Sequence, residues 1–335
     1  MLDELTKLID LSIRKCMNKN KENFYFPIKY ALGIINLDKS KTIIKPGKSI
    51  RPLLCITTYS ASKIHNSKFI QPSLSLEYIH NFSLIHDDIQ DNDEFRHNKP
   101  TVWKVWGKPK ALTFGNILHN LAYLKLSREQ TELSKEQVIK ISQILNSATL
   151  EMIEGQYLDI HFETEKNITE NQYLNMISKK TGALLSASVN IGSIIGNYKT
   201  KDIHILNKFS ESLGYLFQIT DDILGIWGNS SKTGKPVGSD IINRKKSLPI
   251  IHCKNQLNHN DLIKFEKIYS SNKTESDDVE KILDFLNSTN TKSYLNQLTI
   301  KYYESCIEYL DETSLNEEKI TPLKFIVENL VSREK

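Results

Sequence analysis

The stretch that decides the fold is residues 83–91, which read SLIHDDIQD and place three carboxylates at the end of an apolar run. The run before it, from Leu74 onward, repeats its apolar residues with a helical period and is too long for an ordinary strand. Asp87 and Asp91 are four positions apart, so on a helix their side chains project from one face, one turn apart. The pattern therefore predicts a long helix that ends in paired carboxylates.

Two carboxylates at this spacing repel each other unless a cation lies between them. A hard ion such as Mg²⁺ binds carboxylate oxygens, keeps several waters and takes phosphate oxygens as further ligands. For an acidic triplet on its own, a solvated helix end is the simpler interpretation. However, a second acidic pair, Asp221 and Asp222, closes the helical pattern of residues 202–227 in the same way. Because the C-terminal end of a helix is already negative, two such ends favour a metal site in a helix bundle.

The rest of the chain also has helical patterns, and no stretch alternates like a strand bounded by turn residues. Helical spacing covers the opening residues and then about 111–127, 135–162, 170–196, 202–227 and, after polar stretches, the chain to about 332. Loops that contain Pro or Gly are expected at 45–52, 94–101 and 228–236. Because no repeat or long linker separates these patterns, we expect an all-α fold, a single-domain helical bundle over residues 1–335.

The composition is typical of a soluble globular protein, since 39% of the 335 residues are hydrophobic and 25% are charged. The formal charge of +4 is modest and no basic block is interleaved with aromatics, so no nucleic-acid partner is expected. The four cysteines lie far apart without CxxC spacing, which indicates reduced thiols rather than a zinc site or a disulfide framework. Neither a signal-peptide pattern nor an apolar run of about 20 residues is found, so we expect a cytoplasmic protein without a membrane span.

Basic residues stand singly in the segments around the acidic motifs: Lys48, Arg51, Arg96, Lys180, Lys235 and Lys245. An isolated Lys or Arg is usually a solvated surface residue. Together with a divalent cation, these residues suit a small substrate that carries two phosphate groups.

On these motifs the chain resembles the trans-isoprenyl diphosphate synthases, the polyprenyl synthetase family. DDIQD at 87–91 is similar to the first aspartate-rich motif of the family, DDxxD, and QITDDILG at 218–225 to the second, with Gly225 in the final acidic position. Further segments follow the family's order over roughly residues 40–250: GKSIRP at 47–52, GQYLD at 155–159, KKTG at 179–182, GKPVGSD at 234–240 and KKSLP at 245–249. An ordered set of motifs is far more specific than any one of them.

The resemblance implies a helical bundle of the isoprenoid synthase type around a deep central cavity, usually a homodimer, that joins isopentenyl diphosphate to an allylic diphosphate. It implies three Mg²⁺ ions, two bound by Asp87 and Asp91 and one by Asp221. The residues implied for the allylic diphosphate are Arg96, Lys180 and Lys235, with His97 beside them. Those implied for isopentenyl diphosphate are Lys48, Arg51 and His80. Near the reacting carbon it implies Thr181 and Gln218, with Lys245 ordering the closed site.

The implied chemistry suits these residue types. Breaking the allylic C–O bond leaves a carbocation and inorganic diphosphate, and metal ions with fixed Lys and Arg side chains stabilise that leaving group. The isopentenyl double bond then attacks C1 and a proton is lost, so no side-chain nucleophile is needed. An apolar cavity keeps water from the cation.

Four residues depart from the family pattern. Asn98 stands where Gly is common, and Asn116 stands where Asp is common. His97 stands where a second Arg is common, and it carries a positive charge only when protonated. Gly225 removes one carboxylate from the second motif. Because the leading Asp221 is the main ligand of that motif in the family and is retained, we expect activity to survive the change at residue 225.

Bulk upstream of the first motif closes the cavity in this family and limits the product. Phe82 lies five positions before Asp87, and the residue beside it, Ser83, is small. A helical turn rises about 5.4 Å, so one large side chain can stop a chain that grows in five-carbon steps. The pair predicts a C20 product, geranylgeranyl diphosphate, with C15 farnesyl diphosphate as the alternative.

Two other functions are compatible with the same scaffold. A terpene cyclase would ionise one allylic diphosphate and would have little use for Lys48, Arg51 and His80, although His97 favours it. A non-catalytic partner subunit is disfavoured because Asp87, Asp91, Asp221 and Lys180 are all retained.

Overall fold

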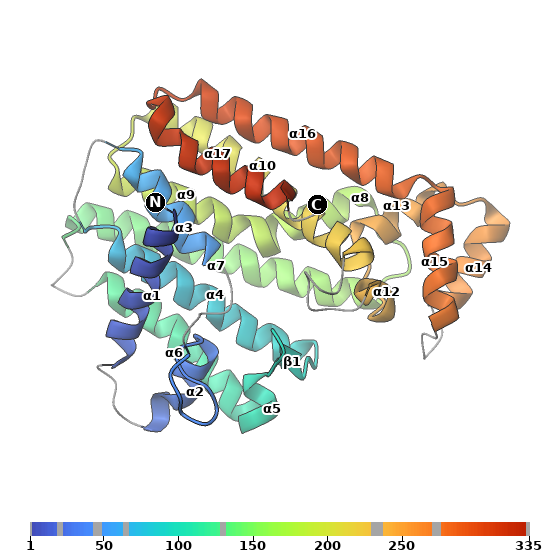
Figure 1. Ribbon diagram of the computed structural model, residues 1–335, viewed down its shortest axis with the longest axis horizontal. Coiled ribbons are helices and arrows are strands. Elements are labelled where there is room, and N and C mark those ends of the chain that lie inside the picture. Colours follow the sequence, from blue (N-terminus) through green and yellow to red (C-terminus); the bar gives the residue numbers. More distant parts are fainter. Residues whose placement is uncertain are drawn as a thin grey trace. The chain divides into compact units, whose positions relative to one another are not determined.

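A computed structural model describes residues 2–18, 23–42, 49–62, 67–127, 132–228, 237–269 and 276–332 (Figure 1). Almost all the regular structure in these residues is helical, which confirms the all-α prediction. The helices of the first half are α1 (Leu2–Asn18), α2 (Phe26–Ala31), α3 (Ile50–Ser60), α4 (Ile70–Gln90), α5 (Val102–Trp106), α6 (Lys108–Leu126) and α7 (Lys135–Thr164), with a 3₁₀ turn, Asn23–Tyr25, before α2. Strands β1 (Phe95–Arg96) and β2 (Lys99–Pro100) form a short hairpin.

The second half continues with α8 (Glu170–Ile177), the π-helix η2 (Ser178–Gly182), α9 (Ala183–Ile195) and α10 (Thr200–Trp227). After α10 come α12 (Ser239–Ile242), α13 (Leu248–Gln256), α14 (His259–Tyr269), α15 (Ser276–Ser288), α16 (Thr291–Glu312) and α17 (Glu317–Val331). None of the helices in the described ranges is both long and apolar enough to cross a membrane.

The chain divides into two compact units. Unit 1 comprises Met1–Leu150, Leu184–Asn207 and Thr313–Leu323, and unit 2 comprises Glu151–Ala183, Lys208–Glu312 and Lys324–Lys335. Three long helices, α7, α10 and α17, contribute residues to both units. The single-domain organisation expected from the sequence stays a prediction.

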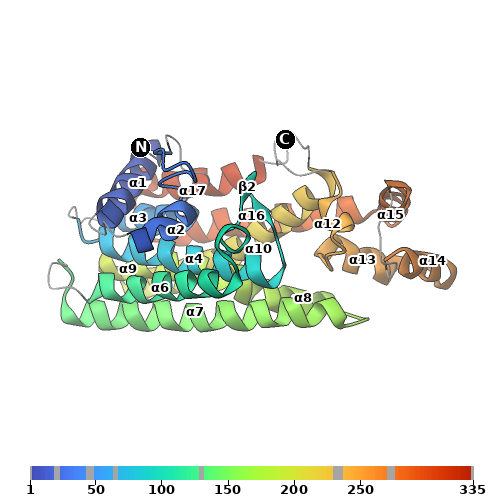
Figure 2. The same cartoon turned by 90° about the horizontal axis from the view of Figure 1, so that it is seen from below.

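In unit 1 the helix that carries the first acidic motif is the central element. α4 packs along α6, and α1 and α3 also contact it (Figure 2). Later residues of α4 meet earlier residues of α6, since Gly115 lies against His86 and His119 against Phe82, so the two helices are antiparallel. Residues 72–79 of α4 are all buried, so this part of the helix has neighbours on several sides. Its apolar residues are therefore not confined to one stripe.

In unit 2 the second half of α10 supplies much of the core. Its buried residues follow the spacing of three and four that marks one face of a helix: Phe209, Leu213, Leu216, Ile219, Ile223 and Ile226. Ile219 and Ile223 pack in a cluster with Tyr173 of α8, Leu248 of α13 and Leu295 of α16. This packing fixes the end of α10 and therefore the acidic pair that it carries.

Candidate active site

The first acidic motif ends α4 with one anchored carboxylate between two more accessible ones. Asp88 is only 4% exposed, and its Oδ1 accepts a hydrogen bond of 2.7 Å from the Arg96 Nε. Burial raises the pKa of Asp88 to about 6, although the Arg96 charge opposes the shift. Asp87 is half-buried and Asp91 is exposed, and both lie on the same face one turn apart. Asp88 is thus committed to the protein, while Asp87 and Asp91 are the accessible pair.

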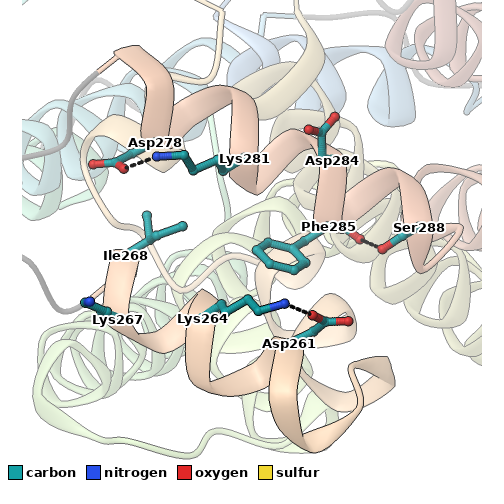
Figure 3. Close-up of a pocket in the computed structure, with 9 residues that line it drawn as sticks. All are labelled: Asp261, Lys264, Lys267, Ile268, Asp278, Lys281, Asp284, Phe285 and Ser288. Atoms are coloured by element: carbon teal, nitrogen blue, oxygen red, sulfur yellow. Dashed lines mark hydrogen bonds and ion pairs between the residues drawn. The ribbon is translucent and has the colours of Figure 1, made fainter.

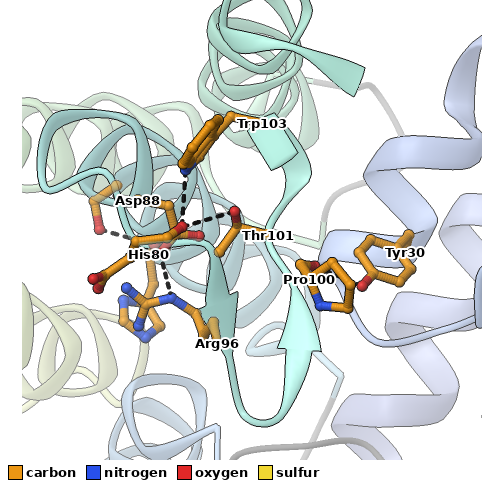
Figure 4. Close-up of polar contacts among 9 residues, drawn as sticks. Tyr30, His80, Asp88, Arg96, Pro100, Thr101 and Trp103 are labelled. Carbon is orange, nitrogen blue, oxygen red and sulfur yellow. Dashed lines mark hydrogen bonds and ion pairs between the residues drawn. The ribbon is translucent and has the colours of Figure 1, made fainter. Parts of the chain in front are cut away.

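A hairpin returns Arg96 to the end of α4 (Figure 4). The prediction of a plain loop at 94–101 is wrong here, because Arg96 pairs with Lys99 across a two-residue turn. The turn residues His97 and Asn98 have φ of 51° and 59°, the left-handed values that such tight hairpins require. Strand alternation was undetectable in the sequence because each strand has two residues.

The hairpin is held from both sides. Thr101 Oγ1 and Trp103 Nε1 both donate to the Asp93 carbonyl, at 2.8 and 2.9 Å (Figure 4). The Tyr30 hydroxyl donates to the Pro100 carbonyl at 2.6 Å. Trp103 and Thr101 therefore hold the chain before β1, and Tyr30 holds β2, so the hairpin that carries Arg96 is fixed at both ends.

Arg51 and His80, expected to share one diphosphate, do meet in unit 1. The Arg51 Nη1 lies 3.1 Å from the His80 Nε2. Burial lowers the pKa of Arg51 to about 10, while the charges of Glu77 and Asp87 oppose that shift. Their expected companion, Lys48, lies outside the described residues.

Phe82 is buried beside two imidazoles. Its ring centroid is 4.7 Å from that of His86 and 5.2 Å from that of His119. A Cβ at residue 115 would lie 2.3 Å from the His86 Nε2, so Gly115 is what lets α6 approach this ring. Ser83, beside Phe82, donates its hydroxyl to the His80 carbonyl at 2.8 Å.

The second acidic motif also has an anchored and an accessible carboxylate. Asp222 is 3% exposed and accepts hydrogen bonds from the Tyr173 hydroxyl at 2.7 Å, the Gln218 Nε2 at 3.0 Å and the Leu248 N–H at 3.2 Å. Burial raises the pKa of Asp222 to about 7, partly offset by these donors. Its neighbour Asp221 is exposed.

Lys180 and Thr181 lie on the π-helix η2, inside the stretch 170–196 that the sequence pattern predicted as one helix. Lys180 forms an ion pair with Asp159, and the Thr181 hydroxyl donates to the Gln218 Oε1 at 2.8 Å. A Cβ at Gly155 would lie 2.2 Å from the backbone nitrogen of Lys180, so α7 contacts the π-helix backbone directly. Single π-turns inside α-helices occur often at functional sites. In the sequence, Gly155 was the residue that could have indicated this close contact between α7 and the π-helix.

Asp240 is a residue of this site that the sequence reasoning missed. A Cβ at Gly225 would lie 2.2 Å from the Asp240 Oδ2, so the Asp240 carboxylate fills the space above Gly225. The exposed Lys245 lies in the segment between α12 and α13, and its backbone N–H donates to the Asp240 carbonyl at 2.9 Å. Lys235 lies outside the described residues.

A groove of about 740 Å³ between α14 and α15 contains none of the predicted site residues (Figure 3). Its lining carries three Lys and three Asp side chains, of which Lys264 pairs with Asp261 and Lys281 with Asp278. A mixed, internally neutralised lining does not attract a diphosphate, and the volume of this groove therefore does not make it the active site.

Metal binding must be judged on the donor set. Among the described residues, no three His, Cys, Asp or Glu side chains converge as a ready-made metal site. Mg²⁺ does not need such a cage, because one or two carboxylates with waters and substrate phosphates satisfy it. The oxygen-only pair of Asp87 and Asp91, and the exposed Asp221, fit that requirement.

Comparisons with known proteins give a consistent result. The model of the polyprenyl synthetase family matches residues 37–286. The short chain isoprenyl diphosphate synthase of Methanocaldococcus jannaschii is 38% identical over 240 residues, 72% of each chain. The geranylgeranyl diphosphate synthase of Sulfolobus acidocaldarius is 32% identical over 290 residues, 86% of this chain and 88% of its own. The crystal structure of geranylgeranyl pyrophosphate synthetase from Pyrococcus horikoshii superposes with a TM-score of 0.88 at 31% identity, covering 99% and 97% of the two chains.

Proposed function

Because the chain belongs to the polyprenyl synthetase family, we propose that it condenses isopentenyl diphosphate with an allylic diphosphate to make a short-chain trans-prenyl diphosphate. The family predicted from the motifs is confirmed, and the protein is a prenyltransferase. The observation that carries the substrate assignment is the pairing of Arg51 with His80, since a buried cation beside an imidazole suits a second diphosphate.

Asp87, Asp91 and Asp221 would hold Mg²⁺, with three ions as the expected number. When bound, the metal would neutralise the diphosphate that leaves the allylic carbon. The anchored residues Asp88 and Asp222 support this role by fixing the ends of α4 and α10. Each motif therefore presents its accessible carboxylates from a rigid helix end.

The allylic diphosphate would be held by Arg96 and Lys180, with His97 at the hairpin tip and Lys235 and Lys245 completing the set. Only the Nε of Arg96 is used by Asp88, which leaves the two terminal nitrogens of the fork for a phosphate. Lys180 would exchange its partner Asp159 for the substrate. Isopentenyl diphosphate would be held by Arg51, His80 and Lys48.

Thr181 and Gln218 would act at the reacting carbon. The Gln218 amide is oriented from both ends, because Oε1 accepts from Thr181 and Nε2 donates to Asp222. A side chain fixed in this way keeps its dipole aligned while charge develops, and it needs no reorganisation during reaction.

The proposed product is C20 geranylgeranyl diphosphate, with C15 farnesyl diphosphate as the runner-up. The buried Phe82 ring, packed on His86 and His119, supports a fixed obstacle, and Ser83 beside it adds little bulk. Purified enzyme with Mg²⁺ and labelled isopentenyl diphosphate should yield C20, and Phe82→Ala should lengthen the product. Products of C30 or longer from the unaltered enzyme would contradict the role of Phe82.

One assay separates the alternatives. Dimethylallyl, geranyl or farnesyl diphosphate is supplied with and without isopentenyl diphosphate, and we expect turnover only with both. Product formed from the allylic substrate alone would indicate a terpene cyclase. No turnover under any condition would indicate a non-catalytic subunit.

We expect a cytoplasmic homodimer. α7 carries a stripe of exposed apolar side chains on one face: Ile139, Leu150, Ile153, Tyr157 and Ile160. From Leu150 to Ile160 these side chains succeed one another on the helix, and an exposed apolar face of this kind usually marks a protein contact. Light scattering should give twice the chain mass, and Ile153→Lys should reduce it to the monomer mass.

A further inference from the structure

The segment that follows the first acidic motif has an uneven charge. Residues 95–127 contain six Lys or Arg side chains and no Asp or Glu, although the whole chain is nearly balanced at 44 basic and 40 acidic residues. Lys108 and Lys110 are exposed in the first turn of α6, where the helix macrodipole disfavours positive charge. Neither lysine forms an ion pair with a residue that the structure describes. Their charge is therefore available to an anionic partner.

Aromatic side chains gather beside these lysines. Trp103 and Trp106 are three positions apart on α5, so they are neighbours on one face of that helix. The Trp106 ring lies 5.8 Å from the ring of Phe26, where α2 packs against α5 (Figure 1). Two of these rings lie under lysines, since the Lys108 Nζ is 5.1 Å from the Trp103 ring centroid and the Lys39 Nζ is 6.0 Å from that of Phe26. Charge and aromatic surface thus occur together.

Phe24 extends this surface toward the second lysine of α6. Its side chain is 48% exposed, and its ring lies 5.9 Å from the ring of Phe114, which is one turn after Lys110 on the same face of α6. The sequence shows no basic block here, because the lysines stand singly and two of the aromatic residues come from a much earlier segment. The aromatic–lysine patch consists of Phe24, Phe26, Trp103, Trp106, Lys108 and Lys110.

We propose that the aromatic–lysine patch docks the protein on the surface of an anionic membrane. Aromatic rings favour the boundary between headgroups and acyl chains, and lysines beside them reach acidic headgroups. A single-stranded nucleic acid would need free ring faces for its bases, but Trp103 and Phe26 already lie under lysines. An anionic lipid surface therefore complements both the charge and the apolar area of the patch.

This docking does not depend on the proposed reaction. It would, however, bring a C20 prenyl diphosphate to the place where its apolar chain leaves water, because such a product is itself an amphiphile. Vesicle binding requires no turnover, so its outcome is independent of the condensation assay.

Sedimentation of the protein with phospholipid vesicles tests the proposal. We expect binding to phosphatidylcholine vesicles that contain about one third phosphatidylglycerol, and little binding to vesicles of phosphatidylcholine alone. The bound fraction should fall between about 0.05 and 0.5 M salt, because exposed charges are screened. An absence of binding to the anionic vesicles would overturn the proposal, and so would equal binding to the two kinds of vesicle.

Substitutions then locate the contact. The double variant Lys108→Glu with Lys110→Glu should weaken vesicle binding at least about 20-fold, since each lysine near an anionic surface contributes about fivefold. Phe24→Ser should weaken it about fivefold, because roughly half of the ring is available for burial in the membrane.

Matched controls carry the same changes elsewhere. Lys199 and Lys201 are exposed at the start of α10, and Lys199→Glu with Lys201→Glu alters the net charge equally. Phe325 is 51% exposed on α17, so Phe325→Ser matches the loss of an exposed ring. Neither control should change vesicle binding by more than about twofold. Thermal denaturation would show that all the variants remain folded.

Three further results would overturn the proposal. The first is a double variant of Lys108 and Lys110 that binds anionic vesicles as well as its control does. The second is a change of mass in light scattering when the patch is altered, which would identify a contact between copies of the chain. The third is tighter binding of single-stranded DNA than of vesicles, measured by fluorescence anisotropy, which would identify a nucleic-acid surface.

Discussion

The ends of α4 and α10 carry nearly the same acidic sequence but anchor their inner carboxylates by different physical means. Asp88 is held by one charged partner, Arg96, whose side chain is 34% exposed. Asp222 is held by three neutral donors in the core of unit 2, with Tyr173 fully enclosed. The first anchor depends on charge and the second on geometry. In both motifs the second carboxylate, Asp88 or Asp222, binds other groups of the protein. The leading carboxylate, Asp87 or Asp221, is more accessible.

The fifth position differs as well. In the first motif Asp91 belongs to the helix end itself, and its N–H donates to the Asp87 carbonyl at 2.8 Å. In the second motif Gly225 leaves room for Asp240 from another segment.

The largest effect on activity should come from the leading carboxylates Asp87 and Asp221, for which the ends of α4 and α10 are expected to be alike. Asp87→Ala or Asp221→Ala should lower kcat on the order of 10³-fold, because the leaving diphosphate loses a metal site. Steady-state kinetics with both substrates would measure this, and circular dichroism should show an unchanged fold. The exposed Asp93, two residues beyond the first motif, offers the control: Asp93→Ala should keep most of the activity. Full activity in Asp87→Ala or in Asp221→Ala would remove that residue from the metal site.

The next effect separates the two anchors by stability. Tyr173→Phe removes one donor from the buried Asp222 and should lower the free energy of unfolding by about 1–3 kcal/mol. Urea denaturation of metal-free protein would measure the change. The partly exposed Tyr303 of α16 gives the matched variant, since Tyr303→Phe should have almost no effect. Equal losses from both variants would mean that Tyr173 is not an anchor.

A smaller effect is expected at the charged anchor. Arg96→Gln should lower the free energy of unfolding by about 1 kcal/mol or less, because the side chain is partly exposed and screened by solvent. The loss should shrink further between about 0.05 and 0.5 M salt, whereas that of Tyr173→Phe should not. Salt-insensitive behaviour of Arg96→Gln would contradict the contrast between the two anchors.

The smallest effect is expected at His97, in the turn of the β1–β2 hairpin that follows the first motif. His97→Arg adds a permanent charge and a forked donor, and it should lower the KM for the allylic diphosphate about threefold. His97→Asn tolerates the φ of 51° and carries no charge, so it serves as the control for backbone effects. An identical KM in the two variants would remove residue 97 from substrate binding.

The sequence alone determined the helical fold, the ends of α4 and α10 and the family. Helical periodicity and ordered motifs are local properties, readable wherever a long amphipathic or buried helix follows its own pattern. The closeness of Arg51 and His80 also followed from the resemblance, although no local pattern predicted it.

Only the tertiary structure decided which member of each acidic pair is committed to the protein. Asp87 and Asp88 look equivalent in sequence, as do Asp221 and Asp222, because burial depends on neighbours far along the chain. The π-turn at Lys180 and the placing of Asp240 over Gly225 are likewise long-range events. At Gly155 the backbone of α7 approaches the backbone of Lys180, and at Gly225 the backbone of α10 approaches the side chain of Asp240. A glycine permits such an approach but does not by itself reveal it.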